Sequence, residues 1–221
     1  MAGSLFIVAT PIGNLGDISL RALEILKSVD LILCEDTRKT RLLLMHYDIK
    51  TPLDSYHQHS SDKKYATIIS LLRKGSSLAL VTDAGTPSVS DPGNELVEFL
   101  TSNENGIKII SIPGASALTS SISICGFNMS KFEFLGFMPK KGRKKIFERI
   151  KEIDMPIIFF ESPFRIRKTL TEILESVGDR RICVCRELTK IYETIYRGTI
   201  SEVLSIMPEK IKGEIVVVVD K

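Results

Sequence analysis

"SLALVTDAGTPSVSDPG", residues 77–93, joins a short apolar run to a long turn made mostly of Gly, Pro, Ser, Thr and Asp. The run at 77–81 is typical of a buried strand, because it is short, apolar and followed by turn residues. The residues after it bury little surface, but small side chains let the main chain approach a bound molecule closely. We therefore interpret the turn at 82–93 as one wall of a pocket, at the end of a strand where open α/β sheets hold ligands.

Strand-like and helix-like segments alternate on both sides of this turn through the first half of the chain. This alternation predicts a mostly parallel sheet with helices packed on it. The expected strands are 5–10, 31–34, 77–81 and 107–112, and the expected helices are 19–29, 37–47, 62–74 and 94–100.

The second half of the chain has a different pattern, which predicts a second α/β domain with a mixed sheet. Its last three expected strands follow one another with little helix between them, which favours antiparallel pairing. We therefore predict two domains, residues 1–113 and residues 114–221. The expected helices here are 115–125, 144–153 and 164–177, and the expected strands are 132–138, 156–161, 181–187, 193–199 and 213–220.

The composition is that of an ordinary soluble globular protein, with 43% hydrophobic and 26% charged residues. No apolar run reaches the roughly 18 residues of a membrane helix, and the first residues lack the basic region of a signal peptide. We expect a cytoplasmic location, no membrane partner and four reduced cysteines. No metal site is predicted either, because the two histidines of "YHQH" (56–59) have no neighbouring Cys to complete a ligand set.

Positive charge is concentrated in one segment of the chain. Residues 140–168 contain ten Lys or Arg and four acidic residues, a net charge of +6, whereas the whole chain carries +3. The run "KKGRKK" (140–145) either forms a solvated surface or binds an anionic partner, and we favour contact with the phosphates of RNA. The candidate RNA-binding residues are Arg38, Arg41, Lys140, Lys141, Arg143, Lys144 and Arg165.

Two further turns of small residues follow other expected strands, "ATPIGNLGD" (9–17) and "IPGASA" (112–117). Neither contains the dinucleotide-binding or P-loop glycine pattern, and the first turn alone is better explained as a plain connection between strand and helix. Three such turns after three parallel strands meet at one edge of a sheet, where main-chain groups can bind a small charged cofactor.

Candidate proton acceptors stand directly after the second expected strand and at the end of the sixth. Glu35 and Asp36 stand beside Arg38, which can fix a carboxylate or a phosphate. A helix cap by Asp36 or Thr37 explains the same residues equally well. Glu161 is the other candidate catalytic residue, with a structural ion pair to Arg165 as its alternative role.

The motifs taken together, in their order along the chain, resemble those of the tetrapyrrole methylase superfamily, and within it the branch that methylates ribosomal RNA. The resemblance covers residues 5 to 219, with Gly85-Thr86-Pro87 in place of the superfamily's usual Gly-Asp-Pro. The motifs are "ATPIGNLGDIS", "CEDTRKT", "TDAGTPSVSDPG", "PGASA", "ESPFRI" and "RELTKIYE".

This resemblance implies a fold of the tetrapyrrole methylase type, with two α/β domains and S-adenosylmethionine bound in the cleft between them. The small side chains of the turns agree with main-chain contacts to its carboxylate, ammonium and sulfonium groups. The positions that correspond to cofactor contacts are Pro11, Ile12, Asp83, Gly85, Thr86, Val89, Ser116, Ala117, Phe160 and Leu188.

The implied activity is methylation of a cytidine 2′-hydroxyl in the decoding region of 16S rRNA, with the RNA or the small ribosomal subunit as partner. A homodimer is usual in the superfamily. Two alternatives remain open: methylation of a tetrapyrrole carbon, as in precorrin or uroporphyrinogen, and an RNA-binding module without activity. The basic run disfavours the first alternative, and the three intact turns disfavour the second.

Overall fold

The structure is a computed structural model that describes residues 2–57, 60, 62–104 and 106–221. The chain divides into two compact units, Met1–Ser116 and Ala117–Lys221. None of the helices formed by the described residues combines the length and the apolar composition needed to cross a membrane.

The first unit contains a five-stranded sheet in the order β3-β2-β4-β1-β5, and every pair of neighbours is parallel. This confirms the predicted parallel sheet. Because β4, β1 and β5 are adjacent, the turns that follow them leave the same edge of the sheet. The strands are β1 (Ser4–Val8), β2 (Leu31–Cys34), β3 (Leu53–Ser55), β4 (Leu78–Leu80) and β5 (Lys108–Ile112).

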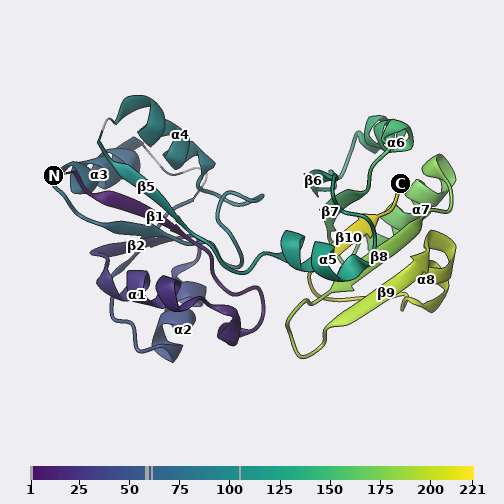
Figure 1. The fold of residues 1–221 in the computed structure, drawn as a ribbon, viewed down its shortest axis with the longest axis horizontal. Helices are drawn as coiled ribbons and strands as arrows, with labels where there is room; N and C mark the ends of the chain where they lie inside the picture. Colours follow the sequence, from purple (N-terminus) through teal and green to yellow (C-terminus); the bar gives the residue numbers. More distant parts are fainter. Residues whose placement is uncertain (1, 58–59, 61, 105) are drawn as a thin grey trace. The chain divides into compact units, whose positions relative to one another are not determined.

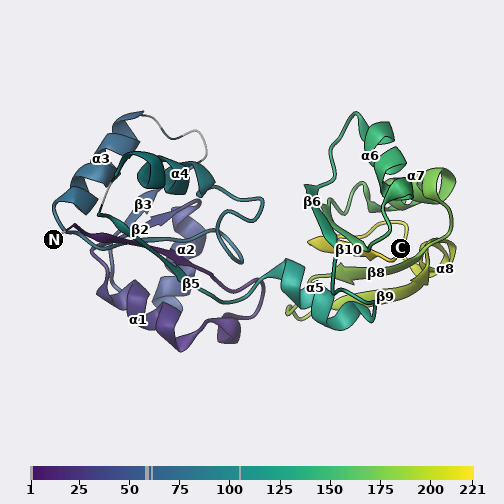
Figure 2. The same ribbon diagram turned by 45° about the horizontal axis from the view of Figure 1, so that its top comes forward.

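Helices cover both faces of this sheet (Figures 1 and 2). The alternation of side chains along β2 shows how: Ile32 and Cys34 pack in the cluster with α1 and α2, whereas Leu33 packs in the cluster with α3 and α4. A strand buried on both faces has the continuous apolar sequence seen here. The helices are α1 (Leu20–Ser28), α2 (Thr37–His46), α3 (Asp62–Arg73) and α4 (Asn94–Asn103), with a short 3-10 turn η1 (Leu15–Asp17).

The second unit contains a mixed five-stranded sheet in the order β6-β7-β10-β8-β9. Strand β6 is parallel to β7, and all other neighbours are antiparallel, as the sequence predicted for the last strands. The strands are β6 (Glu133–Phe137), β7 (Ile157–Glu161), β8 (Arg181–Arg186), β9 (Thr194–Thr199) and β10 (Ile215–Val219).

The central strand β10 is buried on both faces. Ile215, Val217 and Val219 pack with α6, α7 and α8, and the intervening Val216 and Val218 point to the opposite face, where α5 lies against β8 and β10. The helices are α5 (Ala117–Cys125), α6 (Arg143–Glu152), α7 (Ile166–Val177) and α8 (Ile200–Ile206).

Two elements were missed in the sequence. Strand β3 lies at the edge of its sheet and has only three residues, with no alternation to reveal it. The expectation of little helix between the last strands was wrong, because α8 follows β9 directly. Its start is fixed by a capping box in which Thr199 and Glu202 bond each other's main chain.

Candidate functional site

The turns after β1 and β4 are tied together by main-chain hydrogen bonds. The N–H of Thr10 donates to the carbonyl of Gly85 at 2.9 Å, and the N–H of Gly85 donates back to the carbonyl of Thr10 at 3.0 Å. The hydroxyl of Thr10 also donates to the carbonyl of Thr82 at 3.1 Å. The two turns therefore form one structure at the carboxyl edge of the sheet.

The turn after β5 joins the same structure. The N–H of Ala9 donates to the carbonyl of Ile112 at 3.2 Å. The hydroxyl of Thr86 donates to the carbonyl of Ala115 at 3.3 Å. A Cβ at Gly114 would lie 3.0 Å from the Cβ of Ala9. The close approach of the third turn to Ala9 therefore depends on Gly114 having no side chain. All three predicted turns meet at one edge of the sheet.

The backbone of the second turn is unusual, because four of its residues have positive φ. They are Gly85 (85°), Ser88 (72°), Ser90 (66°) and Gly93 (139°). Serine in this region of φ carries strain, and such strain concentrates at binding and catalytic sites. Glycine adopts positive φ readily, so the strain lies at Ser88 and Ser90, where the turn is held in a shape that the residue type does not favour.

The main-chain groups of these turns suit a small charged ligand. Ile12 is only 7% exposed, and no described residue accepts a hydrogen bond from its main-chain N–H or from that of Thr86. A Cβ at Gly85 would already touch the Cγ2 of Ile12 at 3.4 Å. The glycine at position 85 therefore leaves space beside the main-chain N–H groups of Ile12 and Thr86. A ligand carboxylate or ribose can accept hydrogen bonds from these groups. The predicted cofactor residues in this unit are Pro11, Ile12, Asp83, Gly85, Thr86, Val89 and Ser116.

The remaining predicted cofactor residues, Ala117, Phe160 and Leu188, belong to the second unit. Phe160 is half-buried on β7, with its ring edge-on to Phe134 at 5.0 Å and to Phe137 at 5.3 Å between centroids. Leu188 is buried, and the residues on either side of it have φ of 54° and 66°. The loop that presents Leu188 is thus strained in the same way as the turn after β4.

A polar cavity of about 420 Å³ lies beside the carboxyl ends of β2 and β3. One oxygen of Asp83 accepts from the N–H of Asp36 at 3.1 Å, and the other accepts from the Nζ of Lys39 at 2.7 Å. Sequence reasoning missed Lys39, because nothing local links it to Asp83. The cavity is lined by Glu35, Asp36, Thr37, Arg38, Ser55, His57 and Asp83.

Asp36 is the N-cap of α2, as one of the two sequence interpretations held. Its Oδ1 accepts from the main-chain N–H of Arg38 at 2.9 Å, and the Arg38 guanidinium pairs with both oxygens at 3.0 and 2.7 Å. The hydrogen bonds from Arg38 hold the pKa of the Asp36 carboxyl far below its usual value. A carboxylate held in this way is a weak proton acceptor.

Glu35 is the less constrained carboxylate of this cavity. It is half-buried, and it forms no hydrogen bond or ion pair with any residue that the structure describes. A smaller cavity of about 170 Å³ adjoins the first turn and shares Asp83 with the larger one. Its wall includes Thr82, whose buried hydroxyl has no partner among the described residues. The other residues of the wall are Thr10, Pro11, Leu15, Lys39, Thr40, Leu42 and Leu43.

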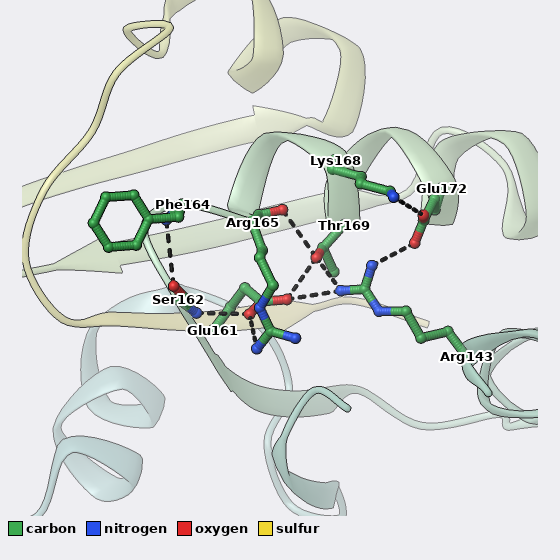
Figure 3. Close-up of polar contacts among 8 residues, drawn as sticks. All are labelled: Arg143, Glu161, Ser162, Phe164, Arg165, Lys168, Thr169 and Glu172. Carbon is green, nitrogen blue, oxygen red and sulfur yellow. Dashed lines mark hydrogen bonds and ion pairs between the residues drawn. The ribbon is translucent and has the colours of Figure 1, made fainter. Parts of the chain in front are cut away.

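Glu161 is buried in a network of charged groups at the end of β7 (Figure 3). Its Oε2 accepts from Arg143 at 2.9 Å and from the Thr169 hydroxyl at 2.5 Å. Its Oε1 pairs with Arg165 at 2.6 Å, which is the structural role that the sequence offered as the alternative. Its side chain has no exposed surface. Glu161 therefore anchors two arginines, and this burial is at odds with a role as proton acceptor.

Arg143 also differs from its sequence interpretation. The side chain is only 10% exposed, and its two terminal nitrogens bond Glu161, Glu172 and Thr169. All three partners are distant in sequence, so the run "KKGRKK" gave no sign of this burial. Arg143 thus ties α6 to β7 and α7, a geometry at odds with direct contact to RNA.

The other members of the basic run remain available. Lys140, Lys141 and Lys144 are exposed around the start of α6, which has no acidic residue in its first turn and no side-chain cap. Cations at this end of a helix oppose its dipole. Arg38 and Arg41 are exposed on α2 in the first unit, whereas Arg165 is largely buried.

No cluster of His, Cys, Asp and Glu among the described residues has the arrangement of a metal site. His57 lines the polar cavity, and His59, the second histidine of "YHQH", lies outside the described residues. All four cysteines are buried and free.

Comparison with known proteins gives a consistent result. A family model described as Tetrapyrrole (Corrin/Porphyrin) Methylases matches residues 4–204. A Thermotoga maritima protein named "Ribosomal RNA small subunit methyltransferase I" is 48% identical over 98% of this chain and 97% of its own length. A Bacillus subtilis protein of the same name is 46% identical over 99% of this chain and 75% of its own length.

Solved structures share the fold at much lower identity. A cobalt precorrin-4 methyltransferase has a TM-score of 0.73 and 16% identity, over 98% of this chain and 94% of that one. A diphthine synthase has a TM-score of 0.74 and 16% identity, over 99% of this chain and 90% of that one. Likeness at this level of identity concerns the fold alone.

Proposed function

The chain belongs to the tetrapyrrole (corrin/porphyrin) methylase family, and from this premise we propose that it methylates ribosomal RNA of the small subunit in the cytoplasm. The acceptor is the 2′-hydroxyl of a cytidine in the decoding region of 16S rRNA. The observation that carries the proposal is the meeting of the three turns at one edge of the first sheet, in a chain 48% identical to a protein named "Ribosomal RNA small subunit methyltransferase I".

Methyltransferases of this family use S-adenosylmethionine. When bound, it would supply a methyl group on a sulfonium sulfur, a chemistry in which an acceptor oxygen bonds to the methyl carbon while the sulfur leaves in line. The residues of the first unit suited to hold it are Ile12, Gly85 and Thr86, since the main-chain N–H groups of Ile12 and Thr86 have no acceptor among the described residues. Phe160 and Leu188 are the corresponding proposed contacts in the second unit.

Positioning accounts for the largest part of the proposed rate enhancement. Holding an acceptor oxygen behind a methyl carbon contributes about 7–11 kcal/mol. A general base adds about 10²–10⁴-fold, or about 3–5 kcal/mol. The enzyme therefore depends first on the shape of the turns, and a base only increases the rate further.

We propose Glu35 as that base. It lines the polar cavity and has no partner among the described residues, whereas Asp36 is held by Arg38 and Glu161 is enclosed in the second unit. Asp36 and Arg38 then shape the cavity wall. This choice follows from accessibility, since a proton acceptor must reach the hydroxyl that it deprotonates.

We also propose that exposed cations bind the RNA backbone. They are Lys140, Lys141 and Lys144 near the start of α6, and Arg38 and Arg41 on α2. Replacing the three lysines together with Gln should weaken RNA binding and reduce the slope of log K against log salt by about 0.7 for each lost phosphate contact on single-stranded RNA. Lys50, exposed in the first unit, provides a control when it is changed to Gln.

The test of the proposed function uses methyl-labelled S-adenosylmethionine and small ribosomal subunits that lack the modification. We expect label in 16S rRNA alone, recovered as 2′-O-methylcytidine from one decoding-region position. Label on a base, or on uroporphyrinogen or precorrin supplied in parallel, would contradict the proposal. Wild-type protein that binds the cofactor and labels none of these acceptors would also contradict it.

A further inference from the structure

Phe164 is the most exposed large apolar residue of the described chain, at 91%. It lies in the turn between β7 and α7, and its ring points away from the charged network around Glu161 (Figure 3). The exposed ring forgoes the stabilisation that burial of a Phe side chain gives.

The turn that presents Phe164 is firmly held. The carbonyl of Ser162 accepts from the N–H of Arg165 at 2.9 Å and from that of Ile166 at 3.0 Å. The Ser162 hydroxyl accepts from the N–H of Phe164 at 3.4 Å, and the Ser162 N–H donates to Glu161 at 2.6 Å. The ring is therefore presented on a fixed support, which lowers the entropy lost on binding.

Single exposed apolar residues are common on protein surfaces, so exposure alone carries no conclusion. The second observation is the charge fixed beside this turn. Glu161 binds Arg165 of the turn and Arg143 of α6, at 2.6 and 2.9 Å, and so ties the turn to the start of the lysine-rich helix. Lys168, on α7 four residues after Phe164, is 75% exposed, with its Nζ 3.8 Å from a carboxylate oxygen of Glu172.

An exposed aromatic ring on a rigid support among cations is the combination that binds single-stranded nucleic acid. A base stacks on the ring, whatever its identity, while the cations contact the phosphates. An apolar protein partner or a second copy of the chain would not account for the exposed lysines around the start of α6, which repel one another unless an anion is present.

We propose that Phe164 is a stacking platform for an unpaired base of the RNA substrate. This inference rests on the proposed function, since it concerns how that substrate is held. The buried pair of Arg143 and Glu161 serves as the brace that fixes the platform relative to the cations at the start of α6.

The experiment compares Phe164→Leu and Phe164→Tyr with the wild-type protein. The probe is a single-stranded RNA of the 16S decoding-region sequence with 2-aminopurine replacing one base at a time. We expect Phe164→Leu to weaken binding by about 5- to 100-fold and to abolish the fluorescence quenching at one probe position, because Leu cannot stack. Phe164→Tyr should keep both the quenching and the affinity. Ile206→Ala, at a 63% exposed apolar position on α8, should bind like wild type.

Three results would overturn this inference. The first is wild-type affinity and quenching in Phe164→Leu, the second is a loss of its affinity for S-adenosylhomocysteine in calorimetry, and the third is a change of its oligomeric state in gel filtration. The second result would place the ring on the cofactor, and the third on another copy of the chain. Failure of the proposed function is distinguishable, because wild-type protein would then leave ribosomal subunits unmethylated.

Discussion

Replacing Glu161 with Ala should strongly destabilise the second unit. The Glu161 side chain has no exposed surface, and its partners Arg143 and Arg165 are only 10% and 24% exposed. Removing it leaves two guanidinium groups without the carboxylate that compensates their desolvation. Breaking a buried ion pair by deleting one partner costs about 3–5 kcal/mol. That is a large part of the 5–15 kcal/mol by which a typical domain is stable, in order of magnitude.

Urea unfolding followed by far-UV circular dichroism measures this loss. The expected result for Glu161→Ala is a transition at lower urea with a smaller free energy of unfolding. Asp154→Ala provides the matched control in the same unit, because Asp154 is 91% exposed in its pair with Lys221 and should leave the urea midpoint unchanged. Glu161→Gln keeps the side-chain shape and an acceptor for Thr169, but it loses the charge, and should be intermediate.

An unchanged midpoint in Glu161→Ala would refute the view that this carboxylate is the structural anchor of the network. A double-mutant cycle with Arg143→Met sharpens the result. Residues in contact within one network couple by about 0.5–3 kcal/mol, so independent effects of the two changes would also contradict the role of the pair as a brace.

Three further predictions concern the first unit. Gly85→Ala places a side chain at a φ of 85°, so it should lower the free energy of unfolding in urea by about 1–2 kcal/mol. It should also weaken S-adenosylhomocysteine binding in calorimetry, and an unchanged affinity would count against the turn as a wall of the ligand site. Glu35→Gln should lower kcat for rRNA methylation by about 10²–10⁴-fold with cofactor affinity unchanged; full activity would exclude Glu35 as the base. Because Arg38 lowers the pKa of Asp36, the stability that this carboxylate contributes is complete above its ordinary pKa of 3.8 and declines as the pH falls below it. The difference in urea midpoint between wild type and Asp36→Asn should therefore shrink below about pH 4. A difference that grows as the pH falls would contradict this prediction.

Most of the fold was predictable, because local pattern and tertiary structure agree. The continuous apolar run of β2 follows from burial on both faces, and the Ser19 and Asp36 caps follow from their place before a helix. Helix α8 was missed although its sequence carries the signal, since Thr199 and Glu202 have capping-box spacing. Edge strand β3 has no such local signal, and only its pairing with β2 defines it.

The candidate site was predictable where it is made of turns, and less so where it depends on side chains. Turns of small residues are visible in sequence, and parallel topology places their ends at one edge. The burial of Arg143 depends on carboxylates 18 and 29 residues away, so a uniform charge run gave no sign of it. The pairing of Lys39 with Asp83, 44 residues apart, was hidden for the same reason.

We propose that the three turns at the edge of the first sheet bind the methyl donor through their main chain. The most direct measurement is a crystal structure of the protein with S-adenosylhomocysteine. Our expectation is that ligand atoms lie within hydrogen-bond distance of the main-chain N–H groups of Ile12 and Thr86. A ligand bound with these turns untouched would contradict it.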